Sequence, residues 1–375
     1  MIAASAPVQR PRDARLLVIG AARAVTQAAR VEWVDHVRPG DLVVANDAAT
    51  LPASLRGTHL ASGAPLEVRL AGRASLATED VSFSAVLFGA GDWRTRTEER
   101  ALPPPLAPGD RLALGPLVAT VQGALGHPRL LRLRFEGEPT AVWAGIARHG
   151  RPIQYAYMSQ ALALWDVWTP IAALPVAFEA PSAGFALDWR SLARLRSRGA
   201  DFATITLAAG ISSTGDPALD ARLPLAEPYR LSAATAAAIG DAKGRGGRII
   251  AVGTTVVRAL EHSGGRAGSG VADQRVGPGT ELGVVDALLT GTHEPQENHY
   301  QMLRAFADEA TLAVASAALE AGRYRTHEFG DSMLVFKTPG AVLSNSAPPK
   351  RHRAWTQVLA GFLRGAAVSS PSASA

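Results

Sequence analysis

The sequence contains no cysteine among its 375 residues. This absence excludes disulfide bonds, thiolate metal ligands and a cysteine nucleophile. There is also no uninterrupted apolar stretch long enough to span a bilayer, and the N-terminus lacks the cationic and apolar pattern of a signal peptide. We therefore expect a cytoplasmic protein that is not bound to a membrane.

Lysine is scarce, and Lys243, Lys337 and Lys350 are the only ones. Arginine therefore carries almost all of the positive charge, although the formal net charge of +5 is modest for this length. Arginine forms bidentate contacts with phosphate and stacks on bases, so a nucleic-acid partner is permitted. A GC-rich genome would produce the same bias. An apolar fraction of 47% and a charged fraction of 19% are typical of a globular protein with one large domain or two moderate ones.

Several generic motifs are missing from the sequence. It has no Gly-x-Gly-x-x-Gly fingerprint, no Walker phosphate loop and no Gly-x-Ser-x-Gly elbow. The run His293-Glu294-x-x-Glu297 approaches a zinc-binding helix, but the second histidine is missing and Pro295 interrupts the helix. We therefore expect no metal ion at this position.

The most informative stretch is residues 248–262. It opens with a β-branched apolar run typical of a buried strand and closes with a helical pattern, and Gly253, Thr254 and Thr255 separate the two. Backbone N–H groups and two hydroxyls would then meet at a helix N-terminus, which attracts anionic ligands. Arg258, one turn further on, would add a fixed positive charge. The alternative is an ordinary strand–turn–helix in which Thr255 is the N-cap.

The pattern of apolar residues changes between about Leu55 and Phe135. Short, alternating apolar runs occur there, separated by glycine-rich turns: Leu66–Leu70, Val81–Leu87, Arg111–Leu114, Leu117–Val121 and Arg129–Phe135. Such spacing predicts a small antiparallel barrel or sandwich. We therefore expect an α/β fold in which a mixed-sheet domain, residues 1–54 and 148–365, carries an inserted β-barrel domain, residues 55–147. The small polar residues 366–375 predict a disordered tail.

Other segments give weaker predictions. A long alanine-rich helix is expected at about Glu297–Ala321, a last helix at Ala354–Leu363, and a mobile glycine-rich segment at Gly264–Gly279. Trp165 and Trp168 are three residues apart, which places them on one helical face. They could belong to the core or to a domain-docking patch, or they could form a platform on which a base stacks.

Polar residues also follow the predicted strands. Asn46 and Asp47 end one strand, 253–255 end another, and 290–293 end a third. In an α/β sheet such positions can gather at the carboxyl edge, where ligands bind. They predict a site without naming a reaction.

Five sequence blocks, taken in their order along the chain, do indicate a reaction. The most specific is Ala-Val-Gly-Thr-Thr-Val-Val-Arg-Ala-Leu-Glu at 251–261, and the others are Pro39–Ala53, Ala180–Gly184, Val284–Pro295 and Tyr324–Met333. Through these blocks the chain resembles, over nearly its whole length, the S-adenosylmethionine:tRNA ribosyltransferase-isomerase family of the queuosine pathway.

The resemblance implies an α/β catalytic domain with an inserted β-barrel. It also implies a reaction in which S-adenosylmethionine is a co-substrate that donates its ribosyl group. The amine of an aminomethyl-deazaguanine base in a tRNA anticodon attacks the ribose, adenine and methionine leave, and epoxyqueuosine is formed. No metal ion or permanently bound cofactor is required, and the family suggests a monomer.

The resemblance also implies the roles of particular residues. The catalytic candidates are His293, Asp286 and Arg258. The candidates for substrate binding are Asn46, Asp47, Ser182, Gly184, Glu227, Gly253, Thr254, Thr255 and Asp331.

The chain departs from the family pattern at several positions. Ala186, Ala208 and Leu225 stand where the family has histidines, and Asn46-Asp47-Ala48-Ala49 replaces Asn-Asn-Thr-Arg. These changes remove groups suited to proton transfer and to anion binding. Two alternatives therefore stay open: a diverged enzyme that uses a non-tRNA acceptor, such as a free deazapurine, or a non-catalytic protein that binds RNA or a nucleoside.

Overall fold

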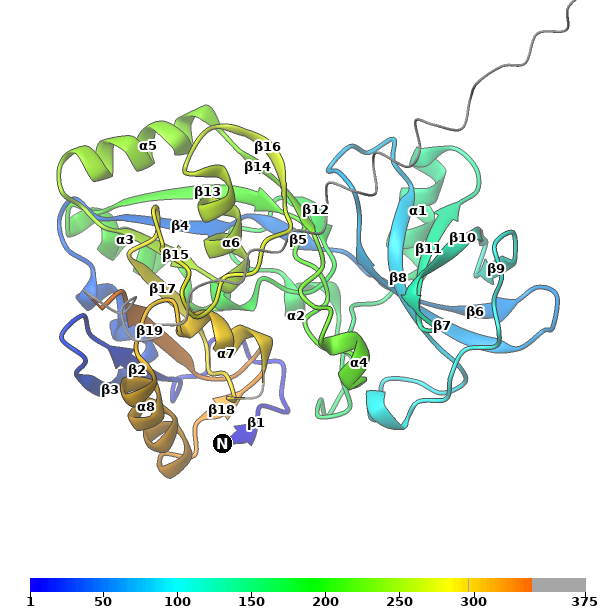
Figure 1. Ribbon diagram of the computed structural model, residues 1–375, viewed down its shortest axis with the longest axis horizontal. Coiled ribbons are helices and arrows are strands. Elements are labelled where there is room, and N and C mark those ends of the chain that lie inside the picture. Colours follow the sequence, from blue (N-terminus) through cyan, green and yellow to red (C-terminus); the bar gives the residue numbers. More distant parts are fainter. Residues whose placement is uncertain (296, 339–375) are drawn as a thin grey trace, which may run out of the picture. The chain divides into compact units, whose positions relative to one another are not determined.

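The structure is a computed structural model that describes residues 1–295 and 297–338. Its main elements are a nine-stranded mixed sheet and a closed six-stranded antiparallel barrel (Figure 1). The predicted α/β fold with a mixed sheet and a β-barrel is confirmed. The predicted helix at 354–363 and the predicted tail at 366–375 lie outside the described residues. No helix in the described part of the chain is long and apolar enough to cross a membrane.

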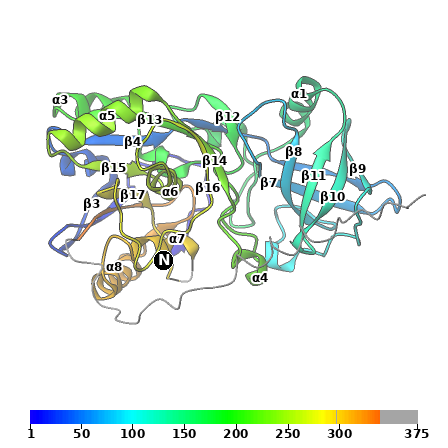
Figure 2. The same ribbon diagram turned by 45° about the horizontal axis from the view of Figure 1, so that its top comes forward.

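The large sheet has the strand order β16-β14-β13-β4-β15-β17-β19-β2-β3. Its strands are β2 (Arg15–Ile19), β3 (Val25–Ala29), β4 (Leu42–Asn46), β13 (Asp201–Leu207), β14 (Glu227–Leu231), β15 (Ile249–Val252), β16 (Gly268–Ala272), β17 (Ala287–Gly291) and β19 (Ser332–Phe336). The central strands β13, β4, β15 and β17 are mutually parallel and lie side by side in both ribbon views (Figure 1, Figure 2). Their carboxyl ends therefore share one edge of the sheet.

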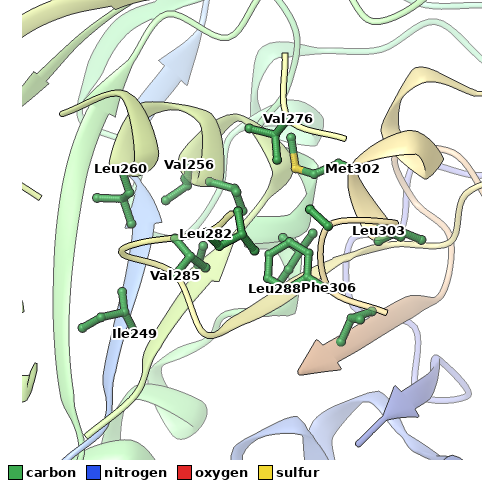
Figure 3. Packing of buried hydrophobic residues seen from close by; sticks show 14 of the residues in the cluster. Ile249, Val256, Leu260, Val276, Leu282, Val285, Leu288, Met302, Leu303 and Phe306 are labelled. Carbon is green, nitrogen blue, oxygen red and sulfur yellow. The ribbon is translucent and has the colours of Figure 1, made fainter. Parts of the chain in front are cut away.

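The central strands are buried on both faces, as their continuous β-branched runs predict. Helices cover the sheet: α3 (Trp189–Ser197), α5 (Ala233–Gly244), α6 (Thr254–Ser263), α7 (Asn298–Leu303) and α8 (Glu309–Ala321). On one face, Ile249 and Leu288 pack with Val256 and Leu260 of α6 and with Phe306 (Figure 3). Successive strand residues point to opposite faces, so Ile250 and Val252 pack instead with α3 and the 3-10 helix η1 (Arg30–His36).

The barrel has the strand order β10-β11-β8-β7-β6-β9. Its strands are β6 (Ser54–His59), β7 (Pro65–Gly72), β8 (Ser82–Phe88), β9 (Arg111–Leu114), β10 (Leu117–His127) and β11 (Leu130–Phe135). Strand β6 was missed in the sequence because Ser-Leu-Arg-Gly-Thr-His holds a single large apolar residue. Helix α1 (Pro139–His149) buries Val142 and Ile146 against the barrel core.

Shorter elements complete the fold. They are β1 (Ile2–Ala3), β5 (Ala48–Thr50), η2 (Thr97–Glu99), α2 (Leu164–Val167), β12 (Leu174–Ala177), η3 (Ser182–Ala186), α4 (Pro217–Asp220) and β18 (Arg325–Thr326). Strand β12 pairs with β5, and β1 pairs with β18.

The prediction of one long helix at 297–321 is wrong. The chain forms α7 and α8 instead, because the Asp308 side chain accepts a hydrogen bond from the Thr311 N–H group at 2.9 Å and starts a new helix. Phe306 is buried in the sheet core between the two helices. The segment 264–279, predicted as a mobile loop, contains β16, which pairs with β14 at the sheet edge.

The interpretation of Trp165 and Trp168 as core residues is also wrong. Helix α2 is a single turn, and the side chains are 76% and 41% exposed. The Trp168 indole N–H group donates to the Thr50 carbonyl oxygen at 2.9 Å, which fixes that ring on the surface. The other two interpretations, a docking patch and a stacking platform, stay predictions.

Candidate active site

A cavity of about 1040 Å³ lies at the carboxyl edge of the parallel strands. Segments that follow four strands contribute to its wall: 179–183 after β12, 209–213 after β13, 253–255 after β15 and 292–293 after β17. This is the position at which α/β sheets bind ligands. Its volume lies at the upper end of the range for small-molecule sites.

Gly253 makes the turn between β15 and α6. Its backbone has φ 102° and ψ 145°, a combination that is nearly restricted to glycine. Helix α6 begins at Thr254 with Gly253 as its N-cap, and no side chain caps its first turn. The alternative in which Thr255 is the N-cap is therefore wrong. Gly253, Thr254 and Thr255 all line the cavity, so the amide groups of this helix N-terminus border it.

We expect Gly253→Ala to lower the free energy of unfolding by about 1–3 kcal/mol, because a Cβ atom disfavours this backbone conformation. Urea denaturation measures the loss. Gly240→Ala is the matched control, since Gly240 is exposed inside α5 with open space around it. There the same change should stabilise the helix by about 0.5–1 kcal/mol. Equal effects at both positions would contradict the assigned strain.

Arg258 and Glu227 form a buried ion pair on the cavity wall, with Arg258 Nη1 at 2.6 Å from Glu227 Oε2. The remaining Arg258 donors reach three backbone carbonyl oxygens, those of Leu225, Ala272 and Gln274. The predicted fixed positive charge of Arg258 is therefore neutralised by Glu227 within the protein. The catalytic role of Arg258 stays a prediction. The position of Arg258 indicates that it holds β14, α6 and the cavity wall together.

Glu227 is occupied in the same way. Its second oxygen, Oε1, accepts from the Gly210 N–H group at 2.8 Å. Burial raises the pKa of Glu227, and the Arg258 charge opposes that rise. Glu227 lines the cavity, but its two carboxylate oxygens already have protein partners.

His293 lies in the cavity wall between two polar partners. Its Nε2 atom is 2.8 Å from the Thr290 hydroxyl, and its Nδ1 atom is 3.3 Å from Glu297 Oε2. The ring of His299 lies beside it, with centroids 5.0 Å apart. Burial and the neighbouring His293 lower the pKa of His299 to about 4, so His299 is neutral at pH 7. Glu297 orients the ring through Nδ1, and Nε2 meets only a hydroxyl on the cavity wall, an arrangement that fits a general acid or base.

The loop at 180–184 contributes unequally to the cavity. Ser182 lines it, whereas Gly184 does not. Gly184 is buried, and a Cβ atom there would come within 2.9 Å of the Thr169 side chain. The predicted ligand contact of Gly184 is therefore replaced by a packing role.

Asn46 and Asp47 are not part of the cavity wall, and the prediction that they face the ligand is wrong. The Asn46 side chain accepts from the Leu207 N–H group and donates to the Leu207 carbonyl, both at 3.0 Å. The Asp47 carboxylate accepts from the hydroxyls of Thr204 and Thr206 at 2.8 Å and 2.7 Å. Both side chains therefore extend the pairing of β4 with β13.

Asp286 and Asp331 also lie away from the cavity wall. Asp286 precedes β17, at the opposite edge of the sheet, and accepts from the Ile249 N–H group at 2.9 Å. Asp331 accepts from the backbone N–H groups of Arg15 and Arg325 at 2.9 Å and 2.8 Å. The predicted catalytic role of Asp286 and the predicted binding role of Asp331 are corrected, because both carboxylates fix strands.

The structure also brings to the cavity five residues that the sequence did not single out. We call Tyr155, Tyr157, Glu179, His327 and Glu328 the tyrosine–carboxylate cluster, and all five line the cavity. Tyr155 donates to Glu179 and Tyr157 donates to Glu328. The two tyrosine rings stack with centroids 5.8 Å apart, and the His327 ring stacks on Tyr157 at 4.1 Å.

These residues carry no recognisable motif. Their one signal in the sequence is position: Glu179 directly precedes the 180–184 block, and His327-Glu328 lies inside the 324–333 block. Among residues 1–295 and 297–338, no group of three histidine, aspartate or glutamate side chains could hold a metal ion.

The comparisons with known proteins agree on one family. A family described as "Queuosine biosynthesis protein" matches residues 1–335. The S-adenosylmethionine:tRNA ribosyltransferase-isomerase of Sorangium cellulosum is 34% identical over 356 residues, covering 88% of this chain and 94% of that protein. The one from Pelobacter propionicus is 35% identical over 317 residues, covering 80% and 86%.

A crystal structure of S-adenosylmethionine tRNA ribosyltransferase from Thermotoga maritima has 25% sequence identity and a TM-score of 0.47, covering 89% of this chain and 96% of that one. The family predicted from the five sequence blocks is confirmed by the family match and the two relatives. The chain belongs to the queuosine biosynthesis protein family.

Proposed function

We propose that the protein is an S-adenosylmethionine:tRNA ribosyltransferase-isomerase. It would transfer and isomerise the ribosyl group of S-adenosylmethionine onto a 7-deazaguanine base in tRNA, giving epoxyqueuosine and releasing adenine and methionine. The observation that carries this proposal is the place of the most specific sequence block. Its Gly253–Thr255 turn borders the cavity at the carboxyl edge of the sheet.

The proposal gives each part of the wall a task. The uncapped first turn of α6, with the hydroxyls of Thr254 and Thr255, would bind polar atoms of the donor. His293, held by Thr290 and Glu297, would move a proton during the transfer. S-adenosylmethionine is then a co-substrate, and the base in the tRNA anticodon loop is the acceptor. We further propose that the protein acts as a monomer in the cytoplasm.

The positions of the missing family histidines are compatible with this activity. Ala186, Ala208 and Leu225 are not among the residues that line the cavity. Ala208 is fully buried in the core on the barrel side, and Leu225 packs against a cluster that contains Ala71 and Phe88. In this chain the candidate for proton transfer on the cavity wall is His293.

The test is to incubate the protein with S-adenosylmethionine and tRNA that carries 7-aminomethyl-7-deazaguanine. We expect adenine in the supernatant by chromatography and epoxyqueuosine in the digested tRNA by mass spectrometry. The same tRNA with guanine at that position is the control. Adenine release with the free base alone would point to a non-tRNA acceptor. Intact donor binding without adenine release under any condition would point to a non-catalytic binding protein.

A further inference from the structure

We propose that Glu179 and Glu328 form a subsite that binds a primary ammonium group of a ligand in the cavity. This proposal rests on the proposed function, because both substrates of that reaction carry such a group. One is the aminomethyl group of the acceptor base, and the other is the amino group of the methionine part of the donor. The shared chemistry is an ammonium that meets two carboxylates.

The cluster is assembled from three separate segments of the chain. Tyr155 and Tyr157 lie in the segment between α1 and α2, Glu179 follows β12, and His327-Glu328 precede β19. His327 has φ 68°, a left-handed conformation that is uncommon for a residue with a side chain. Backbone strain of this kind concentrates at ligand sites. Here it accompanies the stacking of His327 on Tyr157 at 4.1 Å.

The carboxylates of the cluster have neutral hydrogen-bond partners. Glu179 accepts from the Ser212 N–H group at 2.9 Å, from the Ser212 hydroxyl at 2.6 Å and from Tyr155. Glu328 accepts from Tyr157. Within the described residues, neither carboxylate forms an ion pair with an arginine, lysine or histidine. When these two carboxylates are ionised, their hydrogen bonds hold them in place, and no countercharge accompanies them among residues 1–295 and 297–338.

Two other glutamates of the cavity wall differ on this point. Glu227 is paired with Arg258, and Glu297 lies within ion-pair distance of His293. Glu179 and Glu328 are half-buried side chains on the cavity wall. A partly desolvated charge is costly unless an opposite charge accompanies it. A ligand ammonium would supply that charge at Glu179 and Glu328, whereas it would be redundant at Glu227. The Tyr155 and Tyr157 rings would add a cation–π contribution.

Proton binding by the cluster is consistent with this role. Burial, and then the charge of Glu328, raise the pKa of Glu179 to about 7, although Ser212 and Tyr155 oppose that rise. Burial also raises the pKa of both tyrosines well above the ordinary value, so they stay neutral donors.

Arg69 is a charged group near the cluster: its guanidinium lies over the Tyr155 ring at 5.5 Å and is paired with Glu67. A bound cation would therefore lower the pKa of Glu179. At pH 7, where a large fraction of Glu179 is protonated in the empty cavity, ligand binding should release a proton.

Isothermal titration calorimetry tests the proposal with pairs of probes that differ by one ammonium group. Free 7-aminomethyl-7-deazaguanine is compared with 7-cyano-7-deazaguanine, and S-adenosylmethionine is compared with its analogue lacking the amino group. We expect Glu179→Gln and Glu328→Gln each to weaken binding of an ammonium-bearing probe by about 10–100-fold, the effect of a hydrogen bond to a charged group. Binding of the partner probe should change little. Titration of the wild type in buffers of different ionisation enthalpy should reveal proton release near pH 7.

Glu98→Gln is the matched control, since its half-exposed carboxylate lies on the cavity wall and pairs with Arg96. The deazaguanine pair and the donor pair show which substrate supplies the ammonium. Equal losses for both members of each pair, or a wild type that does not prefer the ammonium-bearing member of either, would overturn the proposal. If Glu179→Gln fails to fold, the binding measurements on Glu328→Gln alone test the proposal. If the protein binds ammonium-bearing probes selectively but releases no adenine, the proposed function is wrong and the subsite stands. If it releases adenine but does not prefer ammonium-bearing probes, the subsite is wrong and the proposed function stands.

Discussion

Replacing Glu67 by alanine is expected to lower the free energy of unfolding by about 3–5 kcal/mol, the usual cost of removing one partner from a buried ion pair. Glu67 lies in β7 with 3% of its surface exposed. Its Oε1 atom is 2.7 Å from Arg69 Nε, and its Oε2 atom is 2.6 Å from Arg100 Nη1. Both guanidiniums are also buried, so the substitution removes the carboxylate that neutralises two positive charges inside the barrel domain. Urea denaturation measures the loss.

The matched control is Glu136→Ala, which also removes a glutamate paired with arginine from the barrel domain. Glu136 and its partner Arg111 are exposed, so solvent screens the pair and the substitution should change the stability little. A loss for Glu67→Ala as small as that for Glu136→Ala would contradict the assigned role of the buried group.

The Glu67 group also predicts how stability depends on pH. Burial alone would raise the pKa of Glu67, but the charges and hydrogen bonds of Arg69 and Arg100 outweigh burial and lower it. A carboxylate with a lowered pKa stabilises the fold fully above its ordinary pKa of 4.5, and this contribution falls as the pH drops towards the folded-state pKa. The stability difference between the wild type and Glu67→Ala should therefore be constant near neutral pH and shrink in acid.

His293→Ala is expected to lower the rate of adenine release by about 10²–10⁴-fold, the usual contribution of general acid–base catalysis. The reason is the position of the imidazole in the cavity wall, with Thr290 on one ring nitrogen and Glu297 on the other. Because the effect should fall on the chemical step, kcat should drop while the KM for S-adenosylmethionine changes much less. Steady-state kinetics of adenine release separate the two.

Two further variants sharpen this prediction. His293→Gln can keep a hydrogen bond to Thr290 but cannot transfer a proton at neutral pH, so it should be nearly as slow as His293→Ala. His262→Ala removes an exposed imidazole in the last turn of α6, outside the cavity wall, and should keep wild-type turnover. Recovery of turnover by His293→Gln would reduce His293 to a positioning residue.

The sequence predicted the local elements whose causes are local. The β-branched run at 249–252, Gly253 and the helix that follows were all read from neighbouring residues, because strand burial and turn conformation depend on adjacent side chains. The barrel strands were predicted from the alternation of apolar and polar residues along the chain, with the exception of β6. The prediction of one helix at Glu297–Ala321 failed because the composition favours helix throughout. The burial of Phe306 and the cap formed by Asp308 divide the segment into two helices.

The candidate site was predicted in part. The turn at 253–255 and His293 do line the cavity, whereas Asn46 and Asp47 end a neighbouring strand and do not. Whether a polar side chain at a strand end faces a cavity depends on whether neighbouring protein groups already form its hydrogen bonds. Leu207 in the adjacent strand satisfies Asn46, and nothing in the local sequence of Asn46 indicates that.

The sequence by itself determined the family and the α/β fold with its barrel, because the order of motifs and the apolar periodicity are properties of the linear sequence. Only the tertiary structure decided which charges are free. Arg258 in α6, predicted to add a fixed positive charge, is neutralised by Glu227 from β14. Glu179 and Glu328, far apart in the sequence, lie in one cluster, and no described residue supplies them with a countercharge. Charges interact through space over a few ångströms, so their pairing is fixed only once distant segments are folded together.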